Sequence, residues 1–165
     1  MLSIVIPAHN EADYLAATVR ELTTAARVLD DALEVIVVEN GSTDATLTLA
    51  RDLEAELPEV SVRTRTIADY GAALREGLLA ARGEITVTYD VDYFDLDFAR
   101  RAIDVLERDP RTAVVVGSKR APGARDTRPW SRRVVTAVFT TLVRTGFGLG
   151  VSDTCLLYTS DAADE

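Results

Sequence analysis

The sequence predicts an α/β fold, in which a mostly parallel sheet carries helices on both faces. Short runs of β-branched residues alternate with segments whose apolar residues recur every three or four positions, which is typical of parallel strands joined by helices. Loops rich in Pro, Asn, Gly and Asp follow the strand-like runs, at the edge where such sheets bind ligands. With 165 residues, of which 47% are apolar and 27% charged, the chain suits one folded domain and neither a disordered chain nor a membrane bundle.

The first predicted unit is a strand, a loop and a helix. Residues 2–6 (LSIVI) are apolar and rich in β-branched side chains, so we expect a strand buried on both faces. Asn10 is a suitable N-cap for the helix, with Asp13 three residues further on in the manner of a capping box. The helix is predicted from a single stripe of apolar residues: Leu15, Val19, Leu22, Ala26 and Leu29.

The same alternation continues to residue 116. Residues 60–65 alternate like a strand at the edge of the sheet. Gly83 is expected to end the helix predicted over residues 70–82. The further strands are predicted over residues 34–38, 60–65, 84–89 and 112–116, and the further helices over residues 45–56, 70–82 and a segment with Leu96, Ala99, Ile103 and Leu106 on one face.

Charge is unevenly distributed along the chain. The net charge of −9 argues against nucleic acid as a partner. Residues 1–118 hold 11 basic and 22 acidic side chains, whereas residues 119–154 hold 7 basic and 2 acidic ones. The basic segment is either a solvated face or a surface for anionic groups such as lipid headgroups. Its cations are grouped closely: Lys119, Arg120, Arg125, Arg128, Arg132 and Arg133.

Two observations bear on the compartment. The longest uncharged run, residues 134–143, is about half of the ~20 residues that cross a bilayer. The single Cys cannot form an internal disulfide, which fits a reducing compartment. We therefore expect a cytoplasmic protein.

Two aspartates follow the strand predicted over residues 84–89. Asp90 and Asp92 leave the sheet edge two positions apart, and paired carboxylates can hold Mg²⁺ or Mn²⁺, which take oxygen ligands. The alternative is an acidic loop in solvent, in which Asp95 or Asp97 caps the next helix.

Three further loops are expected at the same edge. Residues 7–11 precede a helix whose N-terminus offers N–H groups to an anionic ligand, although Asn10 could simply cap that helix. Residues 39–44 carry acceptors suited to a nucleobase, and Gly41 permits a tight turn; a capped turn is the alternative. Residues 70–75 contain neither GxGxxG nor the P-loop pattern, which argues against a hydride-transferring enzyme.

Five motifs occur in order: VIPAHNE at residues 5–11, VVENGSTD at 37–44, YGAALREGLLAARGE at 70–84, YDVD at 89–92 and GSKR at 117–120. Together they resemble the family 2 glycosyltransferases of the GT-A (Rossmann-like) fold, and within them the polyprenyl-phosphate and dolichyl-phosphate sugar transferases. The resemblance implies an enzyme of the cell envelope that transfers a hexose from a UDP- or GDP-sugar to a polyprenyl phosphate. A same-fold transferase with a saccharide acceptor and a nucleotide-sugar-binding fragment without turnover are the alternatives.

The resemblance also implies roles for individual residues. Glu39 stands where relatives usually have Asp, and Phe94 where many have Gln, so no third side-chain metal ligand is expected unless Asp95 turns inward. In relatives the basic region receives the lipid phosphate, which implies this role for Lys119, Arg120, Arg132 and Arg133 and a membrane-surface helix over residues 131–145. The donor residues implied are Pro7, Ala8, Asn10 and Glu11 in the first nucleotide loop, Glu39 at the base, Gly71 and Arg75 beside the nucleotide, and Asp90 and Asp92 as the DxD pair that holds Mg²⁺ or Mn²⁺.

We expect the chain to have three parts. Residues 1–118 would form the donor-binding part, and residues 119–154 the start of the acceptor side. Residues 155–165 (CLLYTSDAADE) resemble the translation of a sequencing-library adapter and differ from what the family typically has after Thr154. They are therefore expected to be a non-native tail, with the C-terminal part of the fold missing.

Overall fold

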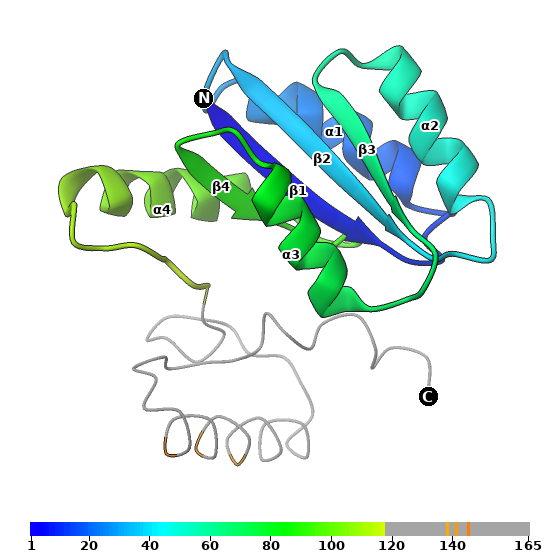
Figure 1. Cartoon of the computed structure of the whole chain (residues 1–165). Helices are drawn as coiled ribbons and strands as arrows, with labels where there is room; N and C mark the ends of the chain where they lie inside the picture. The colour runs from blue at the N-terminus through cyan, green and yellow to red at the C-terminus, as the bar shows by residue number, and fades with distance from the viewer. Residues whose placement is uncertain (118–137, 139–140, 142–144, 146–165) are drawn as a thin grey trace. The chain divides into compact units, whose positions relative to one another are not determined.

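The computed structural model describes residues 1–117 together with 138, 141 and 145. The chain divides into two compact units, Met1–Asp104 and Val105–Glu165, and the sheet lies in the first. The elements are β1 (Leu2–Ala8), α1 (Leu15–Ala26), β2 (Leu33–Asn40), α2 (Thr46–Glu56), β3 (Val60–Arg65), α3 (Tyr70–Ala80), β4 (Ile85–Thr88) and α4 (Leu96–Arg108) (Figure 1).

The four strands form one parallel sheet in the order β3-β2-β1-β4. Ile4 in β1 pairs with Val35 of β2 on one side and with Val87 of β4 on the other. This arrangement confirms the predicted α/β fold and places β3 at the edge, as its alternating residues predicted. Because the strands are parallel, their carboxyl ends all lie at one edge of the sheet. The strand after β1 in the chain, β2, pairs with one side of β1, and β4 pairs with its other side. This point, where the strand order reverses, is the usual ligand site of such sheets.

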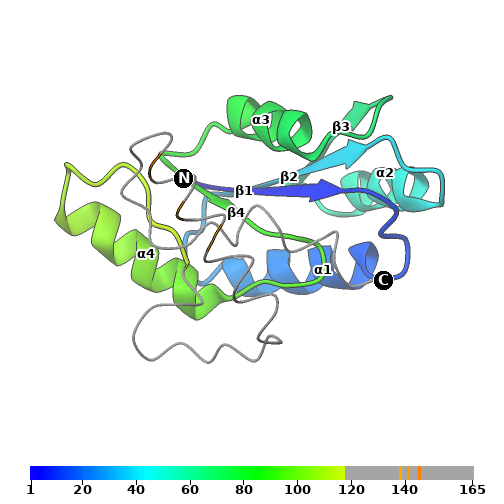
Figure 2. The ribbon, with the colours of Figure 1, turned by 90° about the horizontal axis from the view of Figure 1, so that it is seen from below.

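Helices cover both faces of the sheet. A large apolar core joins one face of the strands to α1, α2 and α4, and a smaller cluster of Val5, Ile36, Val38 and Ala73 joins the other face to α3. Figure 2 shows α3 on the face opposite to α1 and α4. Every residue of β1 is buried, as predicted. The predicted stripe on α1 is confirmed for Leu15, Val19, Leu22 and Ala26, which are fully buried. Its fifth predicted member, Leu29, lies beyond the end of α1 at Ala26 and is only partly buried.

Gly77 brings α3 into close contact with the sheet. A Cβ at this position would overlap Val5 Cγ1 and lie 3.0 Å from Val38 Cγ2. We therefore expect Gly77→Ala to lower the free energy of unfolding by about 1–3 kcal/mol, the usual effect of overpacking a core. Urea unfolding measures this change.

Gly71 in the same helix provides the matched control. A Cβ there would meet only Asp69 Oδ1, at an ordinary 3.6 Å. Gly71→Ala should leave stability unchanged or raise it slightly, because Ala favours a helix more than Gly does. Equal losses in the two variants would contradict the close packing at Gly77.

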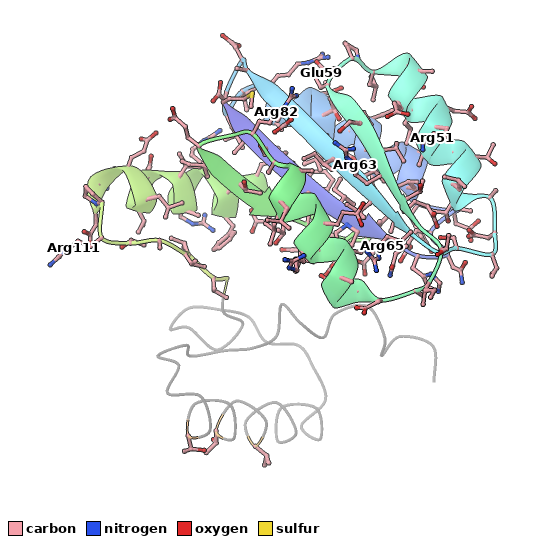
Figure 3. All side chains as sticks on the ribbon, in the orientation of Figure 1. Arg51, Glu59, Arg63, Arg65, Arg82 and Arg111 are labelled. Carbon is pink, nitrogen blue, oxygen red and sulfur yellow. The ribbon has the colours of Figure 1, made fainter. Side chains whose placement is uncertain are left out.

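A buried carboxylate fixes the opposite, amino-terminal edge of the sheet. Glu34, at the start of β2, is 5% exposed, and its Oε1 accepts hydrogen bonds from the Ser3 hydroxyl at 2.6 Å and the Arg82 N–H at 2.6 Å. Its Oε2 pairs with the guanidinium of Arg82, which lies at this edge in Figure 3. The Ser3 hydroxyl in turn accepts from the N–H of Gly83 at 2.7 Å. The network joins β1, β2 and the chain after α3.

Three local predictions are wrong. Asn10 does not cap α1, which begins at Leu15, because Asn10 is engaged by a loop distant in sequence, as described below. Gly83 does not end the third helix, since α3 already ends at Ala80. Residues 112–116 form no strand, and Val114 is 73% exposed. A β-branched run favours a strand only where another strand pairs with it, and none does so among the described residues.

Several predictions concern residues outside this description. The structure does not describe the basic segment, most of the helix expected over residues 131–145, or the tail at residues 155–165. Within the part of the chain that the structure describes, no helix has the length and apolarity needed to span a bilayer.

Candidate active site

The loops after β1 and β2 are joined through Asn10. This residue has a positive φ of 55°, a conformation that Asn tolerates better than most residues. Its N–H donates to the Ser42 hydroxyl at 3.0 Å, and its Oδ1 accepts from the Thr43 N–H at 2.8 Å. Asn10 therefore holds two predicted nucleotide loops together.

Two further contacts strengthen the same junction. The Glu11 N–H donates to Thr46 Oγ1 at 2.8 Å, and the Ala12 N–H donates to Asp44 Oδ2 at 3.2 Å. Burial alone would raise the pKa of Asp44, but hydrogen bonds from Thr46 and from the Ala12 N–H outweigh it and lower that pKa. Asp44 is therefore held as a carboxylate between the two loops.

Asn40, the last residue of β2, connects this junction to α3. Its Oδ1 accepts from the Asp69 N–H at 2.9 Å, and its carbonyl oxygen lies 2.9 Å from Nδ1 of His9, which donates to it. The Asp69 side chain caps α3 by accepting from the Ala72 N–H at 2.9 Å. Through its side chain and its backbone carbonyl, Asn40 thus links the end of β2 to the loops after β1 and before α3.

Gly41 lets the backbone after β2 approach the loop before α3. It has a φ of +69°, and a Cβ there would lie 2.9 Å from the backbone N of Ala68. The predicted tight turn is confirmed. Beside it, the Glu39 side chain is nearly buried, with the residue 3% exposed, and its Oε1 accepts from the Ser42 N–H.

Asp90 lies at the same edge, just after β4. Its Oδ1 accepts a hydrogen bond from the Tyr70 hydroxyl at 3.1 Å, and Tyr70 is the first residue of α3. Burial raises the pKa of Tyr70, and the neighbouring Asp90 carboxylate raises it further, so the hydroxyl stays protonated and donates. The Asp90 carboxylate is therefore held by a side chain from the loop and helix that Asn40 anchors.

The next two acidic residues after Asp90 differ in their surroundings: Asp92 is available to a cation, whereas Asp95 caps α4. Asp92 is exposed in the turn that follows, in which the Tyr93 N–H donates to the Asp90 carbonyl at 3.4 Å. Asp95 does not turn inward as a third ligand, because its Oδ1 caps α4 by accepting from the Phe98 N–H at 2.8 Å. The described residues hold no group of three or more His, Cys, Asp or Glu side chains fit for a metal. The two oxygen donors that remain, Asp90 and Asp92, suit a hard cation whose other ligands are waters and phosphates.

The other predicted site residues have mixed surroundings. Pro7 and Ala8 are buried as the last residues of β1, whereas Gly71 and Arg75 are exposed on α3. Lys119, Arg120, Arg132 and Arg133 lie outside the described residues.

Sequence reasoning missed two residues, Asn40 and Tyr70. Asn40 could have been noticed as a buried amide at the carboxyl end of a central strand. No sequence signal points to the contact between Tyr70 and Asp90.

Comparisons with known proteins agree with this arrangement. Residues 3–164 match the family model described as Glycosyl transferase family 2, and the chain belongs to that family. The undecaprenyl-phosphate 4-deoxy-4-formamido-L-arabinose transferase of Aeromonas hydrophila is 34% identical over 94 residues, which are 56% of this chain and 29% of the relative. The dolichyl-phosphate beta-glucosyltransferase of Trichomonas vaginalis is 26% identical over 163 residues, which are 93% of this chain and 50% of the relative.

A solved structure supports the GT-A fold. The mannosyltransferase of Pyrobaculum calidifontis, in complex with GDP-Man and Mn²⁺, aligns with a TM-score of 0.57 and 28% identity over 66% of this chain and 32% of that one. This chain therefore spans half or less of the length of each of these three proteins.

Proposed function

We propose that this chain supplies the donor site of an enzyme that transfers a hexose from a nucleoside-diphosphate sugar to a polyprenyl phosphate with the help of a divalent cation. The observation that carries the proposal is the position of Asp90 and Asp92 after β4, at the edge where the loops after β1 and β2 are joined. The names of the relatives support the acceptor class, and the mannosyltransferase complex, which holds GDP-Man and Mn²⁺, supports a nucleotide sugar and a divalent cation as ligands. The proposed donor is a GDP- or UDP-sugar, and the proposed cation is Mn²⁺ or Mg²⁺.

The proposed reaction is a displacement at the anomeric carbon. An acceptor oxygen forms a bond to that carbon while the bond from the carbon to the diphosphate oxygen breaks, and its electron pair leaves with the nucleoside diphosphate. A phosphate acceptor is already anionic near pH 7, so it needs no strong general base, whereas a sugar hydroxyl would need one. The residues assigned to the acceptor phosphate are Lys119, Arg120, Arg132 and Arg133.

The chain's own residues would bind and orient the donor. The joined loops would hold the nucleotide, with Glu39 at the base and Gly71 and Arg75 beside it. Asp90 and Asp92 would hold the cation, which when bound would neutralise charge on the departing diphosphate. Because the Asp90 carboxylate is already held by Tyr70, one of these ligands is oriented before the donor arrives.

Calorimetric titration of GDP-mannose and UDP-glucose tests the donor part of the proposal. We expect one of them to bind at least about tenfold more tightly with Mn²⁺ or Mg²⁺ than in excess chelator, a difference of about 1.4 kcal/mol. Equal binding of both with and without metal would contradict the metal-dependent donor site.

The same protein, given labelled donor, separates the acceptor classes. Labelled product that extracts with polyprenyl phosphate supports the lipid acceptor. If the only labelled product is a water-soluble saccharide, the acceptor is a saccharide and not the lipid. Donor binding without any transfer would support a binding module.

A further inference from the structure

Tyr70 makes a contact across the point where the strand order reverses. It begins α3, whose cap Asp69 is tied to Asn40 at the end of β2, yet its hydroxyl donates to Asp90 after β4. In the sheet, β1 lies between β2 and β4. Tyr70 therefore connects the end of β2, on one side of β1, with Asp90 on the other.

We propose that Tyr70 is a positioning residue, whose hydroxyl orients the Asp90 carboxylate for the cation from a helix that is anchored on Asn40. This inference rests on the proposed function, because it takes Asp90 as a cation ligand. In this role Tyr70 would act through Asp90 and not by direct contact with the cation or the donor.

The bond from Tyr70 does not by itself prevent Asp90 from binding a cation. A carboxylate has about four lone-pair sites, and the Tyr70 hydroxyl uses one of them on Oδ1. A partner of this kind limits rotation of the carboxylate, so less freedom is lost when a cation binds. Removing the hydrogen-bond partners of metal ligands typically weakens metal affinity about 10- to 100-fold.

The contacts from Asn40 through Asp69 to Tyr70 explain why loss of the Tyr70 hydroxyl should weaken cation binding and not donor binding. The links are backbone N–H groups held by the side chains of Asn40 and Asp69, each at 2.9 Å, and they fix where α3 begins. Loss of the Tyr70 hydroxyl leaves both links intact. The nucleotide loops should therefore keep their own affinity while the cation binds less tightly.

The test compares wild type with Tyr70→Phe and Tyr14→Phe in the full chain. Tyr14 lies before α1 and is 60% exposed, so it controls for loss of a tyrosine hydroxyl elsewhere. The measurements are the Mn²⁺ concentration for half-maximal GDP-mannose or UDP-glucose binding, donor affinity at saturating Mn²⁺, and melting temperature. Tyr70→Phe should need about 10- to 100-fold more Mn²⁺, with the other two quantities unchanged, and Tyr14→Phe should behave as wild type.

The outcomes distinguish this inference from the proposed function. Wild-type Mn²⁺ dependence in Tyr70→Phe would overturn the positioning role while leaving the donor site intact. A fall in melting temperature together with weaker donor binding at saturating Mn²⁺ would also overturn it, because Tyr70 would then be a structural residue only. Metal-independent donor binding by the wild type would instead overturn the proposed function, and this inference with it.

Discussion

Asp92→Ala should abolish most of the proposed metal-dependent transfer while leaving the fold intact. Asp92 is exposed in the turn after β4, so its removal costs little packing, but it leaves the proposed cation with one aspartate in place of two. We expect hexose transfer to fall on the order of 100-fold, the typical loss when one group that stabilises developing negative charge is removed. The rate of donor consumption with Mn²⁺ measures this, and calorimetry measures the loss of metal-dependent donor binding.

Asp97→Ala is the matched control for this prediction. Asp97 lies in the same acidic stretch, its side chain is 80% exposed, and its oxygen lies a long 3.9 Å from the guanidinium of Arg100. It should keep wild-type metal dependence and activity. If Asp92→Ala also bound the donor as the wild type does in Mn²⁺, the two aspartates would not be the cation site.

Glu34→Gln should produce the largest loss of stability among conservative changes in the sheet. The substitution keeps the size of the side chain but removes the charge that Ser3 and Arg82 bond to. We expect a loss of about 2–3 kcal/mol in the free energy of unfolding, as for a buried hydrogen bond to a charged group. Urea unfolding near neutral pH measures it, and Glu56→Gln, which breaks an exposed pair with Arg20, should change stability little.

The difference between wild type and Glu34→Gln should depend on pH. Burial alone would raise the pKa of Glu34, but bonds from the Ser3 hydroxyl, the Arg82 N–H and the Arg82 guanidinium outweigh it and lower that pKa below the ordinary 4.5. The carboxylate therefore stabilises the fold fully above pH 4.5, and this contribution declines as the pH falls below that value and the group takes up a proton. The stability difference should shrink over that range. A difference independent of pH would show that the charge of Glu34 contributes nothing.

The sheet was predictable from the sequence because its signals are local. The strands β1, β2 and β3 are consecutive or alternating runs of apolar residues, and their order along the chain fixes which ends meet at one edge. Residues 112–116 have the same local signal, and the prediction fails there because a strand also needs a partner.

The candidate site was only partly predictable because its contacts are distant in sequence. Asn10 has the local pattern of a helix cap, but Thr43 competes for its side chain from 33 positions away. Tyr70 and Asp90 are 20 positions apart, and the packing of α3 on β1 and β2 brings them together. The family motifs predict which residues form the donor site, whereas the bonds that join the loops required the structure.

The parallel order of the sheet has a consequence for how the chain folds during synthesis. Leu2 in β1 pairs with Leu33 of β2 on one side and with Ile85 of β4 on the other. One edge of β1 therefore stays unpaired until β4 has been synthesised. Sheets built from such distant pairings form slowly, and their unpaired edges promote aggregation. A nascent chain that has not yet reached Thr88 therefore exposes one edge of β1, and we expect it to be most prone to aggregation during this interval.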